Sequence, residues 1–290
     1  MRGHGTRFEC LRLRPHDHVG WVFSGQAGFD ALAGPFLAEG ADRGERLIYV
    51  AADPGPAAAA RLCAALGLDA VQVASIAEVY GASGIVDAAV QRDTFASALA
   101  DALADGYNGI RVAADNTPMV TDDQRMAAWV RWEITADRFM SENPVTGLCA
   151  FDENKVDVNR LRHLAMLHPL FPADRPVPQF RLFADDGYLC VEGRIDSWAV
   201  TELPGYLNIL PPKTGVLIDL SAATLASRAA LSRLGKLADA GVTVAIRGGD
   251  AALDELVAAG LPASEHLILQ TAPAAAALAA ESRREPPGSR

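Results

Sequence analysis

The stretch PVTGLCAFD, residues 144–152, reads as one short buried strand. Its continuous apolar run, LCAF at residues 148–151, ends at the carboxylate of Asp152. A short apolar run with a polar stop is typical of a strand in the interior of a sheet. We therefore expect this strand to lie at the centre of the first part of the chain.

The segment before this strand, residues 122–140, has the pattern of an amphipathic helix. Large apolar side chains recur there at steps of three or four, which places them on one helical face. These residues are Trp129, Trp132, Ala136, Phe139 and Met140. A further helix is expected to follow the strand, with Asp157 as its N-cap.

The upstream sequence continues the same alternation of strands and helices. An alternation of this kind predicts an α/β domain whose largely parallel sheet is covered by helices on both sides. The expected strands are residues 19–23, 46–51, 71–73, 109–114 and 145–151, and the expected helices include residues 29–38, 57–66 and 95–104.

Polar residues follow several of these strands. Ligands of such sheets bind beyond the carboxyl ends of the strands, so Asp53 and Asp115 are candidate ligand-binding residues, together with a glycine turn at residues 25–28. The same carboxylates would also be expected in loops simply because loops are solvated. The sequence leaves both interpretations open.

The order of strand, glycine turn, helix and strand resembles a RecA-type nucleotide-binding core. Nucleotide hydrolysis on that fold requires a glycine-rich loop with a lysine for the phosphates and a serine or threonine for magnesium. The turn here reads SGQAGFDAL, residues 24–32, which has no lysine, and Asp30 would repel a phosphate. The sequence therefore argues against nucleotide hydrolysis.

Several pieces, taken in order, resemble the MEDS family, the methanogen/methylotroph and DcmR sensory domain. They are His18 before the first strand, FLAEGADRGERLIYVAAD at residues 36–53, the strand at residues 110–115, the Trp132-Glu133 pair, LCAFD at residues 148–152, and His168-Pro169. The resemblance covers residues 8–172. It implies a RecA/KaiC-like three-layer α/β/α fold that lacks a P-loop and senses small molecules.

By this resemblance, His18, Cys149 and His168 are the sensor candidates. Two imidazoles and a thiolate could bind a soft metal or haem, or line a ligand pocket. Each residue also has a structural interpretation: a buried cysteine packs as a small hydrophobe, His168 can cap carbonyls, and His18 can lie on the surface. Sequence spacing does not show convergence, so we expect no metal and no cofactor, and we expect Glu133 to flank the core.

One position departs from the family pattern. The family follows its fourth strand with Gly-Glu and an aromatic residue, whereas this chain reads Ala-Asp-Asn-Thr-Pro at residues 114–118. The departure leaves the role of Asp115 open.

Four prolines between residues 169 and 178 predict a stiff linker at residues 173–178. Beyond it, a hairpin is expected at residues 180–183 and 188–192, with a turn at Asp185-Asp186-Gly187. Helices and strands then alternate to about residue 280, where a disordered tail at residues 281–290 is expected. The further expected strands are residues 215–220, 243–247 and 267–269, and the expected helices are residues 197–203, 228–240, 252–259 and 274–280.

The segment at residues 179–280 resembles a smaller α/β unit, the STAS domain of anti-sigma-factor antagonists. The resemblance rests on GYLCVEGRID at residues 187–196, VLIDLSAATLAS at residues 216–227, and GVTVAIRGG at residues 241–249. It implies docking on an anti-sigma factor or a histidine-kinase-like protein. STAS-like and RecA-like units often self-associate in their families, so a homodimer is also among the expected partners.

This chain departs from the STAS pattern at its regulatory site. The family reads Asp-Ser-Ser-Gly-Leu at a helix start, and here the helix begins Ser227-Arg228-Ala229. Ala229 occupies the position of the phosphorylated serine, so ordinary kinase control at that position is lost. Ser227 could be an alternative acceptor or a simple N-cap.

The composition narrows the function classes. A formal net charge of −10 without a Lys/Arg cluster argues against direct nucleic-acid binding. The sequence has no apolar run of the ~18 residues that a bilayer span needs and no secretory signal, so we expect a cytoplasmic protein without a membrane partner. The four cysteines form no CxxC pair, which indicates free thiols.

These patterns predict a non-enzymatic bacterial signalling regulator in which the MEDS-like domain senses a small molecule and controls the STAS-like domain. The alternative is an enzyme, a nucleotide or acyl hydrolase that uses Asp53, Asp115 or Cys149 with His168 as the base. A third interpretation is a constitutive scaffold in which both domains have lost their control.

Overall fold

The computed structural model describes residues 3–55, 58–67, 71–173, 179–261 and 264–271. The chain divides into two compact units, residues 1–186 and 187–290. The division falls within the turn of the predicted hairpin. Residues 174–178 of the predicted linker, the predicted helix at 274–280 and the predicted tail at 281–290 lie outside the described residues.

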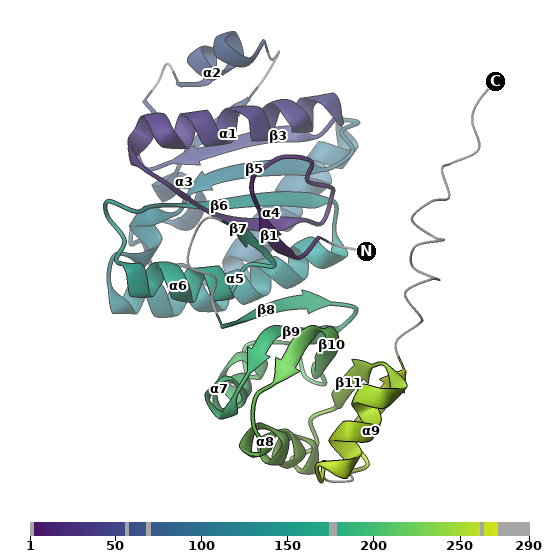
Figure 1. Ribbon diagram of the computed structural model, residues 1–290. Helices are drawn as coiled ribbons and strands as arrows, with labels where there is room; N and C mark the ends of the chain where they lie inside the picture. The colour runs from purple at the N-terminus through teal and green to yellow at the C-terminus, as the bar shows by residue number, and fades with distance from the viewer. Residues whose placement is uncertain (1–2, 56–57, 68–70, 174–178, 262–263, 272–290) are drawn as a thin grey trace, which may run out of the picture. The chain divides into compact units, whose positions relative to one another are not determined.

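The first unit is built on a seven-stranded sheet with the order β1-β7-β2-β6-β5-β3-β4, and its neighbouring strands pair in parallel (Figure 1). This confirms the predicted α/β class. The two shortest strands, β1 and β7, were not predicted because three residues are too few to show a periodicity. The strands are β1 (Gly5–Arg7), β2 (His18–Phe23), β3 (Arg46–Ala51), β4 (Gln72–Ser75), β5 (Ile110–Asp115), β6 (Val145–Asp152) and β7 (Leu170–Pro172).

Helices connect these strands and cover the sheet. The predicted glycine turn at residues 25–28 is wrong, because Gly25 already begins the first helix. The carboxylate of Asp152 accepts a hydrogen bond from the Gly25 N–H at 3.3 Å and so satisfies one of the free donors of that helix start. The helices are α1 (Gly25–Asp42), α2 (Ala58–Leu66), α3 (Ile76–Tyr80), α4 (Ala88–Ala104), the 3₁₀ helix η1 (Thr117–Val120), α5 (Asp123–Glu142) and α6 (Val158–Met166).

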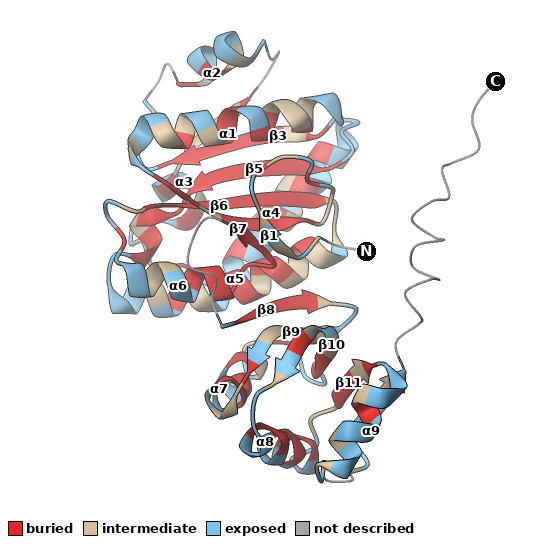
Figure 2. Cartoon of the chain, in the orientation of Figure 1, coloured by how far each residue is buried: buried red, intermediate tan, exposed pale blue. Residues whose placement is uncertain are grey.

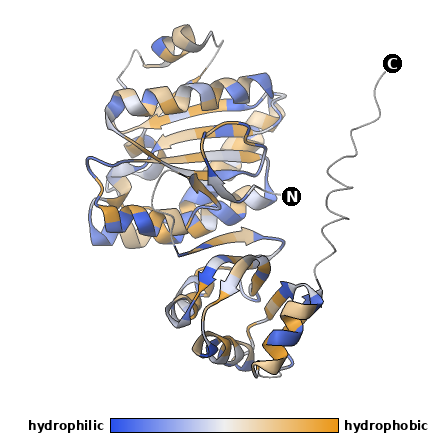
Figure 3. Cartoon of the chain, in the orientation of Figure 1, coloured by the Kyte–Doolittle hydropathy of each residue, from blue (hydrophilic) through white to orange (hydrophobic). Residues whose placement is uncertain are grey.

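Strand β6 is buried along its whole length and separates two apolar cores. Leu148 and Ala150 pack with α1, whereas Cys149 and Phe151 pack with α4 and α5 on the opposite face. This alternation follows from the two-residue period of a strand. Figure 2 shows the buried strands between the helices, and Figure 3 shows that these strands are mostly hydrophobic. The arrangement is a three-layer α/β/α sandwich.

Arg111 is a fully buried charge within this sandwich, and the sequence analysis did not identify it. Its Nε donates to Glu45 Oε2 at 2.6 Å, and its two terminal nitrogens donate to the carbonyls of Phe36 and Leu13, each at 3.1 Å. A Cβ at Gly40 would lie 2.5 Å from Arg111 Cδ, so the glycine gives the guanidinium stem its space. The buried charge is therefore paired and hydrogen bonded, as burial requires.

The second sheet has the strand order β12-β11-β10-β9-β8, and the pairs β9–β10, β10–β11 and β11–β12 are parallel. Its strands are β8 (Phe180–Asp185), β9 (Tyr188–Ile195), β10 (Gly215–Leu225), β11 (Val244–Gly248) and β12 (Leu267–Thr271). The helices of the second unit are α7 (Ser197–Leu207), α8 (Arg228–Asp239) and α9 (Asp250–Ala258).

Helix α7 is capped by Asp196, whose carboxylate accepts from the backbone N–H groups of Trp198 and Ala199. The helix was expected to end at residue 203, but it continues through Pro204 to Leu207. None of the described helices is long and apolar enough to span a bilayer.

Candidate functional site

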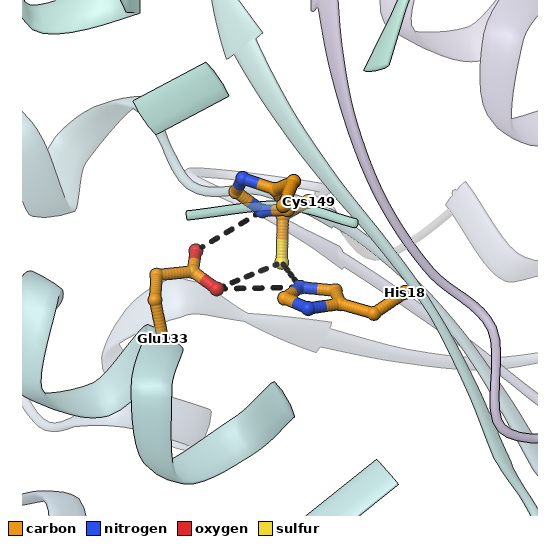
Figure 4. Close-up of side chains that lie close together, drawn as sticks. His18, Glu133 and Cys149 are labelled. Atoms are coloured by element: carbon orange, nitrogen blue, oxygen red, sulfur yellow. Dashed lines mark hydrogen bonds and ion pairs between the residues drawn. The ribbon is translucent and has the colours of Figure 1, made fainter. Parts of the chain in front are cut away.

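The three sensor candidates converge in the first unit. His18 lies on β2 and Cys149 on the neighbouring strand β6, where Gly20 pairs with Cys149. His168 lies between α6 and β7, the strand on the other side of β2. Glu133 on α5 completes the group from the helix layer. Figure 4 shows Glu133 beside His18 and Cys149. All four side chains are buried.

The distances within this four-residue cluster are short. His18 Nε2 lies 3.4 Å from Cys149 Sγ and 3.3 Å from Glu133 Oε2. His168 Nε2 lies 3.5 Å from Glu133 Oε1, and Cys149 Sγ lies 4.0 Å from Glu133 Oε2. One potential ligand atom from each of the four residues lies within 4.8 Å of the other three. The four groups could therefore hold one metal ion.

The outer nitrogen of each imidazole has a fixed acceptor. His18 Nδ1 lies 3.0 Å from Asp137 Oδ1, and His168 Nδ1 lies 2.7 Å from the carbonyl of Leu164. A carbonyl can only accept, so His168 Nδ1 carries a proton. Asp137 is itself held by the Ala184 N–H, which donates to its Oδ2 at 2.6 Å. The Nε2 atoms of both rings are left for the centre of the cluster.

Burial and charge determine the protonation of the cluster. Burial alone would raise the pKa of Glu133, but the imidazoles of His168 and His18 outweigh this and lower its pKa to about 2. Burial would lower the pKa of His18, and the carboxylates of Asp137 and Glu133 raise it instead. Burial raises the pKa of the Cys149 thiol well above its usual value, and Glu133 adds to the rise. Without a metal, the cysteine is therefore a neutral thiol.

Two other predicted ligand residues lie outside the cluster. Asp53 is exposed just beyond β3. Asp115 is buried at the end of β5, where its Oδ1 accepts from the Thr117 N–H at 3.1 Å. Burial raises the pKa of Asp115, and the hydrogen bonds from Thr117 and the charge of Lys155 only partly oppose this rise. Neither aspartate is among the residues that converge on His18.

The sequence analysis missed the acidic part of the site. Glu133 was expected to flank the core, and Asp137 was not considered. The two carboxylates are four residues apart on α5 and lie on the face that also carries Trp129 and Met140. Acidic residues at helical spacing on an apolar face cost free energy unless they are paired, and this signal could have identified them.

A small apolar cavity of about 30 Å³ adjoins the cluster. Cys149 contributes to its wall, and the other lining residues are almost all aromatic or aliphatic, among them Tyr80, Phe95, Trp132 and Met140. A water molecule needs roughly 10–15 Å³ by the same measure, so the cavity fits one or two molecules of that size.

Gly20 sets the space available to His168, which gives a test of the packing. A Cβ at Gly20 would lie 2.7 Å from His168 Cγ, so Gly20→Ala is expected to displace the imidazole and lower the free energy of unfolding by about 1–3 kcal/mol. Gly28→Ala is the matched control, because its Cβ would meet only Phe23 Cβ at 3.8 Å. Urea unfolding measures both, and equal stability of the two variants would contradict the packing.

The predicted regulatory residues of the second unit lie at the start of α8. Ser227 is the N-cap and accepts a hydrogen bond from the Ala230 N–H, so its predicted role as a cap is confirmed. Ser227, Arg228 and Ala229 are all exposed.

Comparison with known proteins gives one result that names a family. The model of the MEDS family, described as the MEthanogen/methylotroph, DcmR Sensory domain, matches residues 17–169, which is just over half of the chain. This range contains His18, Glu133, Cys149 and His168. No curated protein matches the chain. The chain therefore belongs to the MEDS family of sensory domains, and a signalling role follows from this membership.

Proposed function

We propose that this protein is a non-enzymatic signalling regulator whose MEDS unit binds a small input molecule at the buried cluster. The observation that carries the proposal is the convergence of His18, Glu133, Cys149 and His168 from four separate segments of the chain. Burying four polar side chains costs free energy that a purely structural core avoids. A binding role explains why they are placed together.

The cavity beside Cys149 limits the size of an input. Its volume of about 30 Å³ and its apolar wall favour a small neutral molecule over a nucleotide or a sugar. The input would contact the Cys149 thiol in the wall of the cavity. A small displacement of Cys149 would then change its contact with His18 Nε2, which lies 3.4 Å from Cys149 Sγ.

A hydrolytic role for Cys149 has less support. A catalytic cysteine acts as a thiolate in a partly exposed, electropositive site. Cys149 is buried, and both burial and the Glu133 carboxylate raise the pKa of its thiol. The proposal therefore treats the chain as a binding protein and not as an enzyme.

The second unit is proposed to be a STAS-like output domain that docks on an anti-sigma factor or a histidine-kinase-like protein. Two observations support this proposal: three sequence segments resemble STAS domains, and the start of α8 is exposed. Ala229 cannot be phosphorylated, so the input from the MEDS unit would replace phosphorylation as the control. Two copies of the chain could also meet through this unit.

Binding assays with the full chain test this output. The probes are purified anti-sigma factors and histidine-kinase-like ATPases of the source organism. Arg228→Glu is expected to weaken capture at least tenfold, whereas Arg233→Glu, exposed one turn and a half further along α8, leaves it unchanged. Glu133→Gln alters the proposed input site, so it is also expected to change the affinity of the full chain for the captured protein. The proposal is wrong if no such protein binds, or if Arg228→Glu and Arg233→Glu act alike.

The cap of α8 gives a smaller, independent prediction. Ser227→Ala removes the side chain that accepts from the Ala230 N–H at 3.2 Å, and it should lower stability by about 1 kcal/mol. Ser232→Ala on an exposed position of the same helix is the control and should be neutral or slightly stabilising. Chemical denaturation followed by circular dichroism compares the two, and an equal effect would argue against the cap.

A further inference from the structure

We infer that His18, Glu133, Cys149 and His168 together bind one divalent transition-metal ion, with zinc as the best fit. The inference rests on the proposed function only in that it names the chemistry of the same site. The ion would be a resident group beside which the small neutral input binds.

The spacing of the four ligand atoms fits a tetrahedral ion. Ligand atoms about 2.1 Å from a metal at tetrahedral angles lie about 3.4 Å from one another. The measured separations are 3.3 Å from His18 Nε2 to Glu133 Oε2, 3.4 Å from His18 Nε2 to Cys149 Sγ, and 3.5 Å from His168 Nε2 to the other carboxylate oxygen, Glu133 Oε1. The fourth, from Cys149 Sγ to Glu133 Oε2, is 4.0 Å, and sulfur lies further from a metal than nitrogen does.

Two buried polar atoms of the cluster, Glu133 Oε1 and His168 Nε2, face each other without a donor between them. A carboxylate has only lone pairs, and an imidazole whose Nδ1 carries the proton offers a lone pair at Nε2. Glu133 Oε1 and His168 Nε2 are buried and have no hydrogen-bond partner among the described residues. Buried acceptors that face each other without a donor are costly, and a cation between them removes the cost.

The surroundings of the imidazoles are those of metal ligands. Metal-binding histidines almost always pass their other N–H to a carboxylate or a backbone carbonyl. His18 has Asp137 in this position at 3.0 Å, and His168 has the carbonyl of Leu164 at 2.7 Å. These partners fix the ring orientations, so both Nε2 atoms point to the same place before any ion arrives.

The donor set selects the metal class. Two nitrogens, one sulfur and one carboxylate suit zinc and its neighbours in the first transition row. Calcium and magnesium prefer sites made of oxygen ligands, so they fit this cluster poorly. On binding, Cys149 would lose its proton to solvent and become the thiolate ligand.

One competing arrangement uses the same residues without a metal. A protonated His18 can form an ion pair with Glu133 and Asp137, and the cluster is then a polar network within the core. That network needs no cysteine, whereas a metal site gives Cys149 a direct role. The thiol therefore separates the two arrangements.

Metal titration of the full, chelator-treated chain tests the inference. Calorimetry with Zn²⁺ is expected to show one ion per chain, and Co²⁺ is expected to give the visible absorption of a tetrahedral site with a thiolate charge-transfer band. Cys149→Ser should abolish that band. Cys63→Ser on α2 is the matched control, since that free, half-buried thiol is outside the cluster, and it should leave the band unchanged.

Substitutions of two acidic residues of the site extend the test. Glu133→Gln, which keeps the shape of a ligand side chain, is expected to lower Zn²⁺ affinity more than tenfold. Asp137→Asn, which removes the charge of the carboxylate beside His18 Nδ1, should lower it by about 10–100-fold. The metal titration of the unmodified chain tests the inference without any substitution, so the test stands even if a variant fails to fold.

The inference is overturned if the full chain binds neither Zn²⁺ nor Co²⁺ at one ion per chain. It is also overturned if Cys149→Ser and Cys63→Ser give the same Co²⁺ spectrum. Partner capture is measured separately, so loss of metal binding with intact capture rejects the metal site alone. Metal binding without any captured partner supports the metal site and rejects the proposed output.

Discussion

Arg111→Met is expected to lower the free energy of unfolding of the first unit by about 3–5 kcal/mol. The substitution keeps an unbranched side chain on β5 but removes a charge that is fully buried. Glu45, only 3% exposed, would lose the guanidinium that donates to it at 2.6 Å. The carbonyls of Leu13 and Phe36 would also lose their donor from Arg111. Removing one partner of a buried ion pair leaves the other uncompensated, and this sets the size of the loss.

Arg92→Met is the matched control for this prediction. Arg92 pairs with Asp93 at 2.7 Å, but both side chains are more than half exposed. Exposed pairs contribute between about 0 and 1 kcal/mol, so this variant should unfold almost as the unmodified chain does. The double variant Arg111→Met with Glu45→Gln should recover part of the loss, because no buried carboxylate is left unpaired. Urea unfolding measures all three, and equal midpoints for Arg111→Met and Arg92→Met would refute the account.

Removal of zinc is expected to destabilise the first unit by about 4 kcal/mol. A ligand that binds only the folded chain stabilises it by RT ln(1 + [L]/Kd), which is about 4 kcal/mol when free zinc exceeds Kd a thousandfold. The prediction rests on the inferred site, whose ligands come from β2, α5, β6 and the segment before β7. An ion that joins these four segments should raise the unfolding midpoint strongly, and a chelator should reverse the rise.

Glu133→Gln gives the internal control for zinc. The variant lacks the carboxylate ligand, so its unfolding midpoint should move far less between zinc and chelator than that of the unmodified chain. Magnesium at the same concentration should shift neither protein, because the donor set contains nitrogen and sulfur. A midpoint that is the same with zinc and with chelator in the unmodified chain would contradict the prediction.

Much of the fold could be predicted from local patterns. The apolar run at residues 148–151 predicts the buried strand β6, and the spacing of Trp129, Trp132 and Met140 predicts α5. Both periodicities depend on neighbours within a few residues, so they are visible in the chain itself. Short strands such as β1 and the continuation of α7 through Pro204 were not predicted, because tertiary packing decides them.

The candidate site was predicted in part. His18, Cys149 and His168 were identified through the family resemblance, and the structure brings them together. Glu133 and Asp137 were not identified as site residues, because an acidic side chain on a helix is usually solvated, although both fall on the apolar face of α5. Asp53 and Asp115 follow strands as expected of ligand residues, but the site lies deeper in the sandwich, beside β2 and β6.

By itself, the sequence determined the α/β class, the family of residues 17–169, and the absence of a phosphate-binding lysine in the first turn. Tertiary structure decided that His18, Glu133, Cys149 and His168 meet. Their meeting depends on the strand order β7-β2-β6 and on α5 covering that part of the sheet. Strand order is set by long-range packing between segments more than a hundred residues apart, and no local period in the chain records it.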